Sequence, residues 1–164
     1  MLLMPLICVV FFNEAPFGNE TNPFVDNPGY LRSDYTVDTS LVRFQTGEGK
    51  FQLGESVRGH DVYIVTDVLS HNLTFPINVG DHTISPDDHF RDLLRIVSTC
   101  SGKARRINVI MPFLYESRQH KRTARESLDC ALALQEMVNM GVDNIITFDA
   151  HDPRVVNAIP LNGF

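Results

Sequence analysis

Cysteine is scarce in this sequence, and the spacing of its three cysteines excludes two common kinds of structural site. Cys8, Cys100 and Cys130 are far apart, and no Cys-x-x-Cys pair occurs. The pattern therefore indicates neither a zinc knuckle nor a disulfide framework. Cys100 and Cys130 fall within helical patterns, where a free cysteine typically packs as a small hydrophobic residue.

Positive charge is also scarce. Against 20 acidic residues there are 14 lysines and arginines, which gives a net charge of -6. A protein that coats nucleic acid or an anionic membrane needs a basic face, so the net charge argues against both functions without excluding a local basic pocket. The length of 164 residues and the apolar fraction of 43% are typical of one globular domain.

The apolar start of the chain lacks the features of a targeting segment. Residues 1–12 have no basic n-region, contain Pro5, and show no small-x-small cleavage site before Asn13. The run is too short to span a bilayer. We therefore expect a buried first strand there and a cytoplasmic protein. Residues 13–38 are polar and rich in proline, glycine and asparagine, which is typical of a loop.

Common catalytic motifs are absent as well. Neither a Gly-x-Gly-x-x-Gly motif nor a P-loop occurs, and there is no Gly-x-Ser-x-Gly elbow or His-Glu-x-x-His pair. His60, His71, His82 and His89 lack the spacing of metal ligands, so we expect them on the surface or in loops. The chemistry must be sought in other residues.

Strand and helix patterns alternate from residue 39 onward. Residues 39–44 and 51–53 predict a β-hairpin around a turn with two glycines. Apolar runs at residues 62–66, 107–111 and 144–148 are typical of buried strands. With a helix expected between each pair of runs, the order predicts an α/β fold. We expect a parallel sheet flanked by helices and joined by right-handed crossovers.

The two expected helices have clear ends. The first begins at Ser85, a capping residue, followed by Pro86 and two aspartates that suit the positive end of the helix dipole, and it ends at Gly102. The second ends at Gly141. By helical spacing, the faces expected to pack on the sheet are Phe90, Leu93, Leu94, Val97 and Cys100 in the first helix, and Leu128, Ala131, Leu132, Gln135 and Val138 in the second.

Four cations cluster directly after the strand at residues 107–111. They are Arg118, Lys121, Arg122 and Arg125, within eight residues of an otherwise acidic chain. Guanidinium groups fork onto phosphate oxygens, and lysine adds a point charge. Charge alone would favour a solvated loop without a ligand. In open parallel sheets, however, ligands bind outside the carboxyl ends of strands, and this placement favours a phosphate site.

A second polar segment follows the strand at residues 144–148. It reads Asp149-Ala150-His151-Asp152. A carboxylate and an imidazole two residues apart can share a metal ion or polarise a phosphate, and Mg²⁺ keeps several waters beside its protein ligands. Alternatively, Asp149 and Asp152 cap the next helix, helped by Pro153. The two interpretations are compatible.

Three blocks of the sequence, in the right order, resemble the ribose-phosphate pyrophosphokinases. They are residues 43–48 with 54–65, residues 109–115 with Arg118-Gln119, and residues 141–151. The resemblance runs from about Thr39 to the last residue. It implies an amino-terminal ATP-binding domain over residues 39–164, with residues 1–38 as a poorly matched start.

The resemblance also implies roles for individual residues. Phe44 would stack on adenine and Glu48 would read its amino group, on a hairpin that serves the active site of a neighbouring subunit. His151, with Asp149 beside it, would contact Mg²⁺ and the phosphates. The residues implied in ATP binding are Phe44, Glu48, Arg118, Gln119 and His151, with Lys121, Arg122 and Arg125 as further candidates.

The family reaction moves the diphosphoryl group of ATP to ribose 5-phosphate, giving phosphoribosyl pyrophosphate and AMP in a homo-oligomer. Members carry a second domain with the phosphoribosyl-binding loop and a catalytic flexible loop. This chain ends at Phe164, near the domain junction, so we expect that domain to be absent and the chain alone to have little activity. The alternatives are a non-catalytic regulatory or assembly homologue and an unrelated nucleotide-binding α/β domain.

The sequence departs from the family pattern at three places. Glu116-Ser117 adds a residue to the family's Tyr-Ala-Arg-Gln-Asp segment, and His120 replaces its aspartate. Ala158 stands where the family has an acid before Ile159-Pro160. These departures indicate a divergent subfamily.

Overall fold

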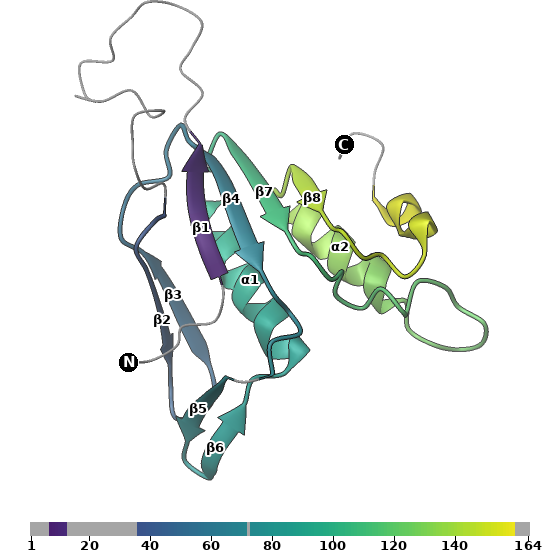
Figure 1. Cartoon of the computed structure of the whole chain (residues 1–164), viewed down its shortest axis with the longest axis horizontal. Coiled ribbons are helices and arrows are strands. Elements are labelled where there is room, and N and C mark those ends of the chain that lie inside the picture. The colour runs from purple at the N-terminus through teal and green to yellow at the C-terminus, as the bar shows by residue number, and fades with distance from the viewer. Residues whose placement is uncertain (1–6, 13–35, 72, 160–164) are drawn as a thin grey trace, which may run out of the picture.

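A four-stranded sheet organises the domain in the computed structural model, which describes residues 7–12, 36–71 and 73–159 (Figure 1). Its strands are β1 (Ile7–Phe12), β4 (Asp61–Thr66), β7 (Arg106–Ile110) and β8 (Asn144–Ile146), in the order β1-β4-β7-β8. β4, β7 and β8 are parallel, as predicted, whereas β1 pairs antiparallel with β4. The α/β class is confirmed, and a strand forms at Ile7–Phe12 within the apolar start of the chain. Most of the loop expected before residue 39 lies outside the described residues.

Two helices connect the parallel strands. α1 (Pro86–Cys100) links β4 to β7, and α2 (Asp129–Asn139) links β7 to β8. Because β4, β7 and β8 advance in one direction across the sheet, right-handed crossovers place both helices on the same face. Figure 1 shows both behind the strands. A short 3-10 helix, η2 (Pro153–Ala158), follows β8.

The start of α1 forms as the sequence predicts. Ser85 accepts a hydrogen bond from the backbone N–H of Asp88, and the Asp88 side chain accepts one from the backbone N–H of Ser85. This capping box satisfies two amide groups that the helix itself leaves unpaired. The predicted inward residues of α1 are all buried. His89 is a correction: it is 1% exposed, and its ring contacts the carbonyl oxygen of Ser70 at 2.9 Å.

The face predicted for α2 is wrong in part. Leu132 is 57% exposed and Gln135 is exposed, whereas Leu134 and Met137 are almost fully buried. The buried residues of α2 are Cys130, Ala131, Ala133, Leu134 and Met137. The sequence carries apolar residues on more than one side of this helix, so its periodicity does not define one face.

Two hairpins lie outside the main sheet. β2 (Thr39–Arg43) and β3 (Gly49–Leu53) form the predicted one, and β5 (Thr74–Ile77) and β6 (Gly80–Thr83) form one that the sequence did not indicate to us. The backbone N–H of Asn78 donates to the carbonyl oxygen of Gln45 at 3.2 Å, which joins the two turns. Figure 1 shows the β5–β6 hairpin beside the turn of β2–β3.

The core lies between α1, α2 and the parallel strands. Val62, Ile64 and Val109 are 0% exposed and face a helix layer in which Leu93 and Ile96 are equally buried. Burial of such side chains is the main stabilising contribution in a domain of this size. The two described cysteines, Cys100 and Cys130, are free and buried, as predicted. In the part of the chain that the structure describes, none of the helices combines the length and the hydrophobicity that a transmembrane span requires.

Candidate functional site

The segments that follow β7 and β8 run side by side at the carboxyl edge of the sheet. The backbone N–H groups of Phe148 and Asp149 donate to the carbonyl oxygen of Pro112 at 3.1 and 3.0 Å, and Phe113 forms a parallel bridge with Asp149. The N–H of Leu114 donates to the carbonyl oxygen of Asp149 at 3.3 Å. The two polar segments that follow β7 and β8 therefore belong to one surface of the molecule.

The basic loop also reaches the second segment through His120. The rings of His120 and His151 lie 5.3 Å apart between centroids, and His120 Nε2 lies 3.3 Å from Asp152 Oδ2. Asp152 also caps η2, since its side chain accepts a hydrogen bond from the N–H of Arg154 at 2.8 Å. Hydrogen bonds from Arg154 hold the pKa of Asp152 well below its usual range. The capping interpretation holds for Asp152, and Asp149 remains exposed before it.

A groove of about 450 Å³ lies beside Arg118. Its walls come from the segment after β4, from the start of α1 and from the loop after β7. Ser117 contributes a hydroxyl that is buried and has no hydrogen-bond partner among the described residues. The lining residues are Val68, Leu69, His71, Pro86, Phe113, Tyr115, Glu116, Ser117 and Arg118. The groove thus has one exposed guanidinium at the carboxyl edge of the sheet, and one unpaired hydroxyl is buried in a residue of its lining.

The segment after β4 was missed by the sequence analysis. The groove is lined in part by Val68, Leu69 and His71. The sequence predicted ligand-binding residues only after β7 and β8. The signal was available, because the carboxyl ends of all parallel strands meet at the same edge of a sheet. His71, which the sequence predicts only as a surface or loop residue, thus lines a groove.

The other predicted phosphate ligands are arranged differently from Arg118. The side-chain amide of Gln119 donates to Glu126 Oε2 and to the carbonyl oxygen of Ser127, both at 3.0 Å. Glu126 also accepts from Thr123, and these hydrogen bonds lower the pKa of Glu126 to about 2. In this conformation Gln119 therefore organises the loop. Lys121, Arg122 and Arg125 are exposed and lie outside the lining of the groove.

Tyr115 fixes the wall between the groove and α1. Its ring stacks on Phe90 with centroids 4.4 Å apart and planes within 9°, and its hydroxyl donates to Asp87 Oδ1 at 2.7 Å. Burial and this acceptor both raise the pKa of Tyr115, so the hydroxyl stays protonated and continues to donate. Tyr115, which precedes the predicted ligands Arg118 and Gln119, is therefore anchored on α1.

The two residues predicted to recognise adenine lie on the β2–β3 turn. Phe44 is 48% exposed and Glu48 is exposed. A second groove of about 380 Å³ runs between this turn and the β5–β6 hairpin, and Glu48 lines it. No residue lines both this groove and the groove beside Arg118. Glu48 and Arg118 therefore line different grooves.

The predicted metal ligands, Asp149 and His151, are both exposed at the end of β8. Within the described ranges, no three His, Cys, Asp or Glu side chains are grouped closely enough to form a metal cage by themselves. A carboxylate and an imidazole at an open edge are nevertheless a suitable partial set for Mg²⁺, which takes one or two protein ligands plus phosphate oxygens and water.

The fold and this edge define an α/β domain of the class that binds ligands outside the carboxyl ends of its strands. Residues 32–141 match the family described as the N-terminal domain of ribose phosphate pyrophosphokinase. The chain belongs to this family, and the resemblance seen in the sequence is confirmed.

Individual relatives agree with that assignment. Ribose-phosphate pyrophosphokinase 1 of Schizosaccharomyces pombe is 35% identical over 116 residues, which cover 70% of this chain and 25% of the relative. Ribose-phosphate pyrophosphokinase of Parasynechococcus marenigrum is 31% identical over 115 residues, which cover 69% of this chain and 30% of the relative. The chain thus spans a third or less of the length of these two proteins.

A solved structure is similar in fold. The phosphoribosylpyrophosphate synthetase of Mycobacterium smegmatis superposes with a TM-score of 0.63 over 75% of this chain and 37% of that chain. The sequence identity of 23% means that this likeness concerns the fold alone.

Proposed function

We propose that this chain is the ATP-binding amino-terminal domain of a ribose-phosphate diphosphokinase, with residues 39–164 as that domain. The observation that carries the proposal is the contact between the basic loop after β7 and the Asp149–Asp152 segment after β8. Arg118 lies on the groove, and His120 of the same loop contacts the Asp149–Asp152 segment. A polyphosphate is the ligand class that suits a guanidinium, a buried hydroxyl donor and a nearby carboxylate–imidazole pair.

In this proposal Arg118 binds the phosphates of ATP as a fork of N–H donors. The Ser117 hydroxyl, which is buried here, supplies a further donor when the loop moves to expose it. Gln119 contributes if its amide exchanges Glu126 for a phosphate oxygen. Asp149 and His151 would hold Mg²⁺, which supplies charge neutralisation when it is bound with the nucleotide. Phosphoryl transfer depends mainly on positioning and charge neutralisation, and these residues supply both.

The full reaction that we propose transfers diphosphate from ATP to ribose 5-phosphate, giving phosphoribosyl pyrophosphate and AMP. We propose further that the 164-residue chain does little of this chemistry alone, because the family's ribose-phosphate site draws on a second domain. The separation of the Phe44–Glu48 turn from the Arg118 groove supports a homo-oligomer in which the turn serves a neighbouring subunit.

A regulatory or assembly homologue is the second candidate. Two observations favour it. The Gln119 amide donates to Glu126 and Ser127. His120, which replaces the aspartate of the family pattern, contacts Asp152 through its ring. A chain of this kind would keep the fold and the subunit contacts while losing tight ATP binding.

Calorimetric titration with Mg²⁺-ATP separates the two candidates. We expect Arg118→Met to weaken binding about tenfold or more, because a hydrogen bond to a charged group contributes about 1.5–3 kcal/mol. Arg91→Met is the matched control, since Arg91 is an exposed arginine of α1 whose ion-pair partner is Glu136 at 3.9 Å. Equal affinities of both variants would contradict the phosphate role of Arg118.

The same preparations should be assayed for AMP formation from ATP and ribose 5-phosphate. The enzyme-domain proposal expects ATP binding with little turnover by the chain alone. Rapid turnover would contradict the need for a second domain. Light scattering establishes whether the preparation is oligomeric. If an oligomeric preparation does not bind ATP, the regulatory homologue is favoured.

A further inference from the structure

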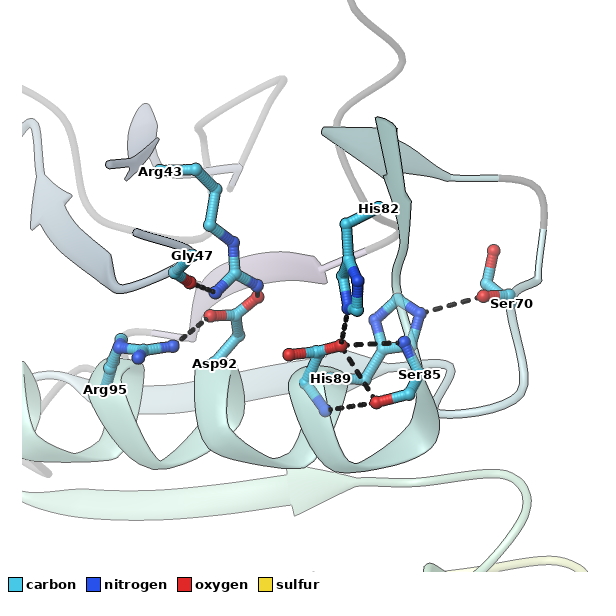
Figure 2. Close-up of polar contacts among 9 residues, drawn as sticks. Arg43, Gly47, Ser70, His82, Ser85, His89, Asp92 and Arg95 are labelled. Atoms are coloured by element: carbon cyan, nitrogen blue, oxygen red, sulfur yellow. Dashed lines mark hydrogen bonds and ion pairs between the residues drawn. The ribbon is translucent and has the colours of Figure 1, made fainter. Parts of the chain in front are cut away.

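A buried ion cluster links the β2–β3 hairpin to α1 (Figure 2). Arg43, the last residue of β2, donates to Asp92 Oδ2, and Arg95 Nη1 donates to Asp92 Oδ1 at 2.6 Å. The Asp92 side chain is 0% exposed and that of Arg43 is 9% exposed. We call Arg43, Asp92 and Arg95 the Arg43 cluster. If the hairpin moved off the helix, the buried Asp92 carboxylate would keep only Arg95 and the Arg43 guanidinium would lose its partner, so the cluster holds the hairpin on the helix.

Arg43 makes two further contacts that reach the turn and the second hairpin. Its Nη1 lies 3.5 Å from the carbonyl oxygen of Gly47, and its guanidinium carbon lies 4.8 Å from the centre of the Phe75 ring on β5. A guanidinium over an aromatic face is attracted by the ring quadrupole. One side chain therefore joins β2, the turn at Gly47, α1 and β5.

The turn itself has a defined geometry. The N–H of Phe44 donates to the carbonyl oxygen of Glu48, and the N–H of Gly47 donates to the carbonyl oxygen of Phe44, both at 2.8 Å. Gly47 has φ 91°, a conformation that glycine adopts without strain. Asn78 then ties the turn to the β5–β6 hairpin through Gln45. Phe44 and Glu48 thus stand at the two ends of a closed turn whose base is held by Arg43.

Close packing beside Gly49 supports this arrangement. A Cβ atom at Gly49 would lie 2.9 Å from Arg95 Nη1 and 3.0 Å from Arg43 Nη1. The two guanidinium groups of the cluster therefore pack directly over the backbone of Gly49, next to Glu48. A longer residue there would push the cluster away from the turn.

We infer that Arg43, Asp92 and the β5–β6 hairpin are positioning elements for nucleobase recognition, because they hold Phe44 and Glu48 in the geometry that binds adenine. The inference rests on the proposed function and extends it to residues that contact no phosphate. Preorganisation of this kind raises affinity by reducing the ordering that binding must otherwise produce. Preorganisation of the turn therefore strengthens binding of the nucleobase and leaves the Arg118 groove unchanged.

The anchoring step can be tested without any nucleotide. We expect Arg43→Met to accelerate hydrogen exchange of the Phe44 and Gly47 amides about tenfold or more, since local opening of a loosened turn needs less free energy. Arg91→Met, the same substitution one position from Asp92 on α1, should leave both rates unchanged. Unchanged exchange in a folded Arg43→Met variant would overturn the anchor, whatever the protein binds.

The recognition step requires two ligands. Inorganic tripolyphosphate probes the phosphate loop alone, whereas ATP also engages the base residues. For the oligomeric wild type with Mg²⁺, we expect ATP to bind more tightly than tripolyphosphate. Arg43→Met should reduce that preference about tenfold and leave tripolyphosphate binding unchanged, because a small misplacement of a binding group is costly. A purely structural role would weaken both ligands together or neither.

The double variant Arg43→Met/Asp92→Leu protects the test against misfolding, because it also removes the Asp92 carboxylate, so no buried acid loses its partner. It should show the same loss of ATP preference. An unchanged preference in either folded variant would overturn the positioning role. A wild type that binds ATP no better than tripolyphosphate would refute the proposed adenine turn and this recognition role with it, while the exchange result would still decide the anchor.

Discussion

At the residue scale, Glu116 has an unfavourable backbone conformation. It is the only non-glycine residue of the described ranges with a positive φ, at 56°. Glu116 and Ser117 together stand where the family pattern has one residue. Burial, followed by the charges of Asp129 and Asp87, raises the pKa of its carboxyl group. The added residue is therefore accommodated by a left-handed turn in an acidic neighbourhood.

We expect Glu116→Gly to stabilise the domain by about 0.5–1 kcal/mol, because glycine adopts positive φ freely and the like-charge repulsion disappears. Urea unfolding measures the change. Glu136→Gly is the matched control on the exposed side of α2, where glycine should instead cost about 1 kcal/mol. If both substitutions destabilise equally, the Glu116 side chain makes a stabilising contact that outweighs its strained backbone.

Asp61 provides a second test at this scale. Arg105 donates to both its carboxylate oxygens, at 2.8 and 2.5 Å, and these hydrogen bonds lower the pKa of Asp61. A lowered folded-state pKa means that the pair stabilises the fold above the unfolded value of about 4 and that this stability is lost as the pH falls through the folded pKa.

We therefore expect Asp61→Asn to cost about 1.5–3 kcal/mol at pH 7 and less at acid pH, because the wild type loses the charged hydrogen bonds there. Urea unfolding between pH 7 and pH 2 measures both. Asp81→Asn, on exposed β6, should leave the curve of the wild type unchanged. An equal cost of Asp61→Asn at all pH values would show that the ion pair is unimportant.

At the element scale, α1 and α2 differ in how well the sequence defines them. α1 carries a Ser85 cap and one apolar face, and both were predicted correctly; the reciprocal Asp88 hydrogen bond of its capping box was not predicted. α2 has no side-chain cap at Leu128, and apolar side chains occur around its circumference. Its orientation is consequently set by packing against the sheet, which periodicity alone does not reveal.

The corrected face of α2 makes a sharp prediction. Leu134 is 2% exposed and Leu132 is 57% exposed, so the same substitution two positions apart should behave differently. We expect Leu134→Ala to destabilise by about 2–5 kcal/mol and Leu132→Ala by less than about 1 kcal/mol. Thermal or urea unfolding measures both. Comparable losses would mean that Leu132 is covered, for example by another subunit.

Other elements show the same division between local and long-range information. The β2–β3 hairpin and the three parallel strands could be predicted because their signals are local: turn glycines and short β-branched runs. The β5–β6 hairpin was missed, since it carries a proline in β5 and an exposed second strand. The antiparallel pairing of β1 was also missed, because strand direction across a long connection is not written in a local pattern.

At the scale of the whole molecule, the prediction of one ligand edge rests on topology. Parallel strands brought the segments after β7 and β8 together, and that much followed from their order. Which side chains face the groove did not follow, since Gln119 turns into its own loop while Ser117 is buried beside Arg118. Side-chain direction depends on loop hydrogen bonds formed by Glu126, which no spacing rule anticipates.

The separation of the two grooves shapes the account at this scale too. The β2–β3 turn, which carries Phe44 and Glu48, and the loop after β7, which carries Arg118, are separate in the fold (Figure 1), and they line different grooves. If ATP contacts both, we expect a second copy of the chain to supply one of them. The central claim is therefore that the phosphates bind at Arg118 and that the base meets the turn of a neighbour.

A crystal structure of the chain with Mg²⁺ and a non-hydrolysable ATP analogue tests this claim most directly. We predict phosphate oxygens within hydrogen-bond distance of the Arg118 guanidinium, the metal beside Asp149 and His151, and the adenine ring on Phe44 of a second copy. A nucleotide bound away from the carboxyl edge of the sheet, with Arg118 free in solvent, would contradict it.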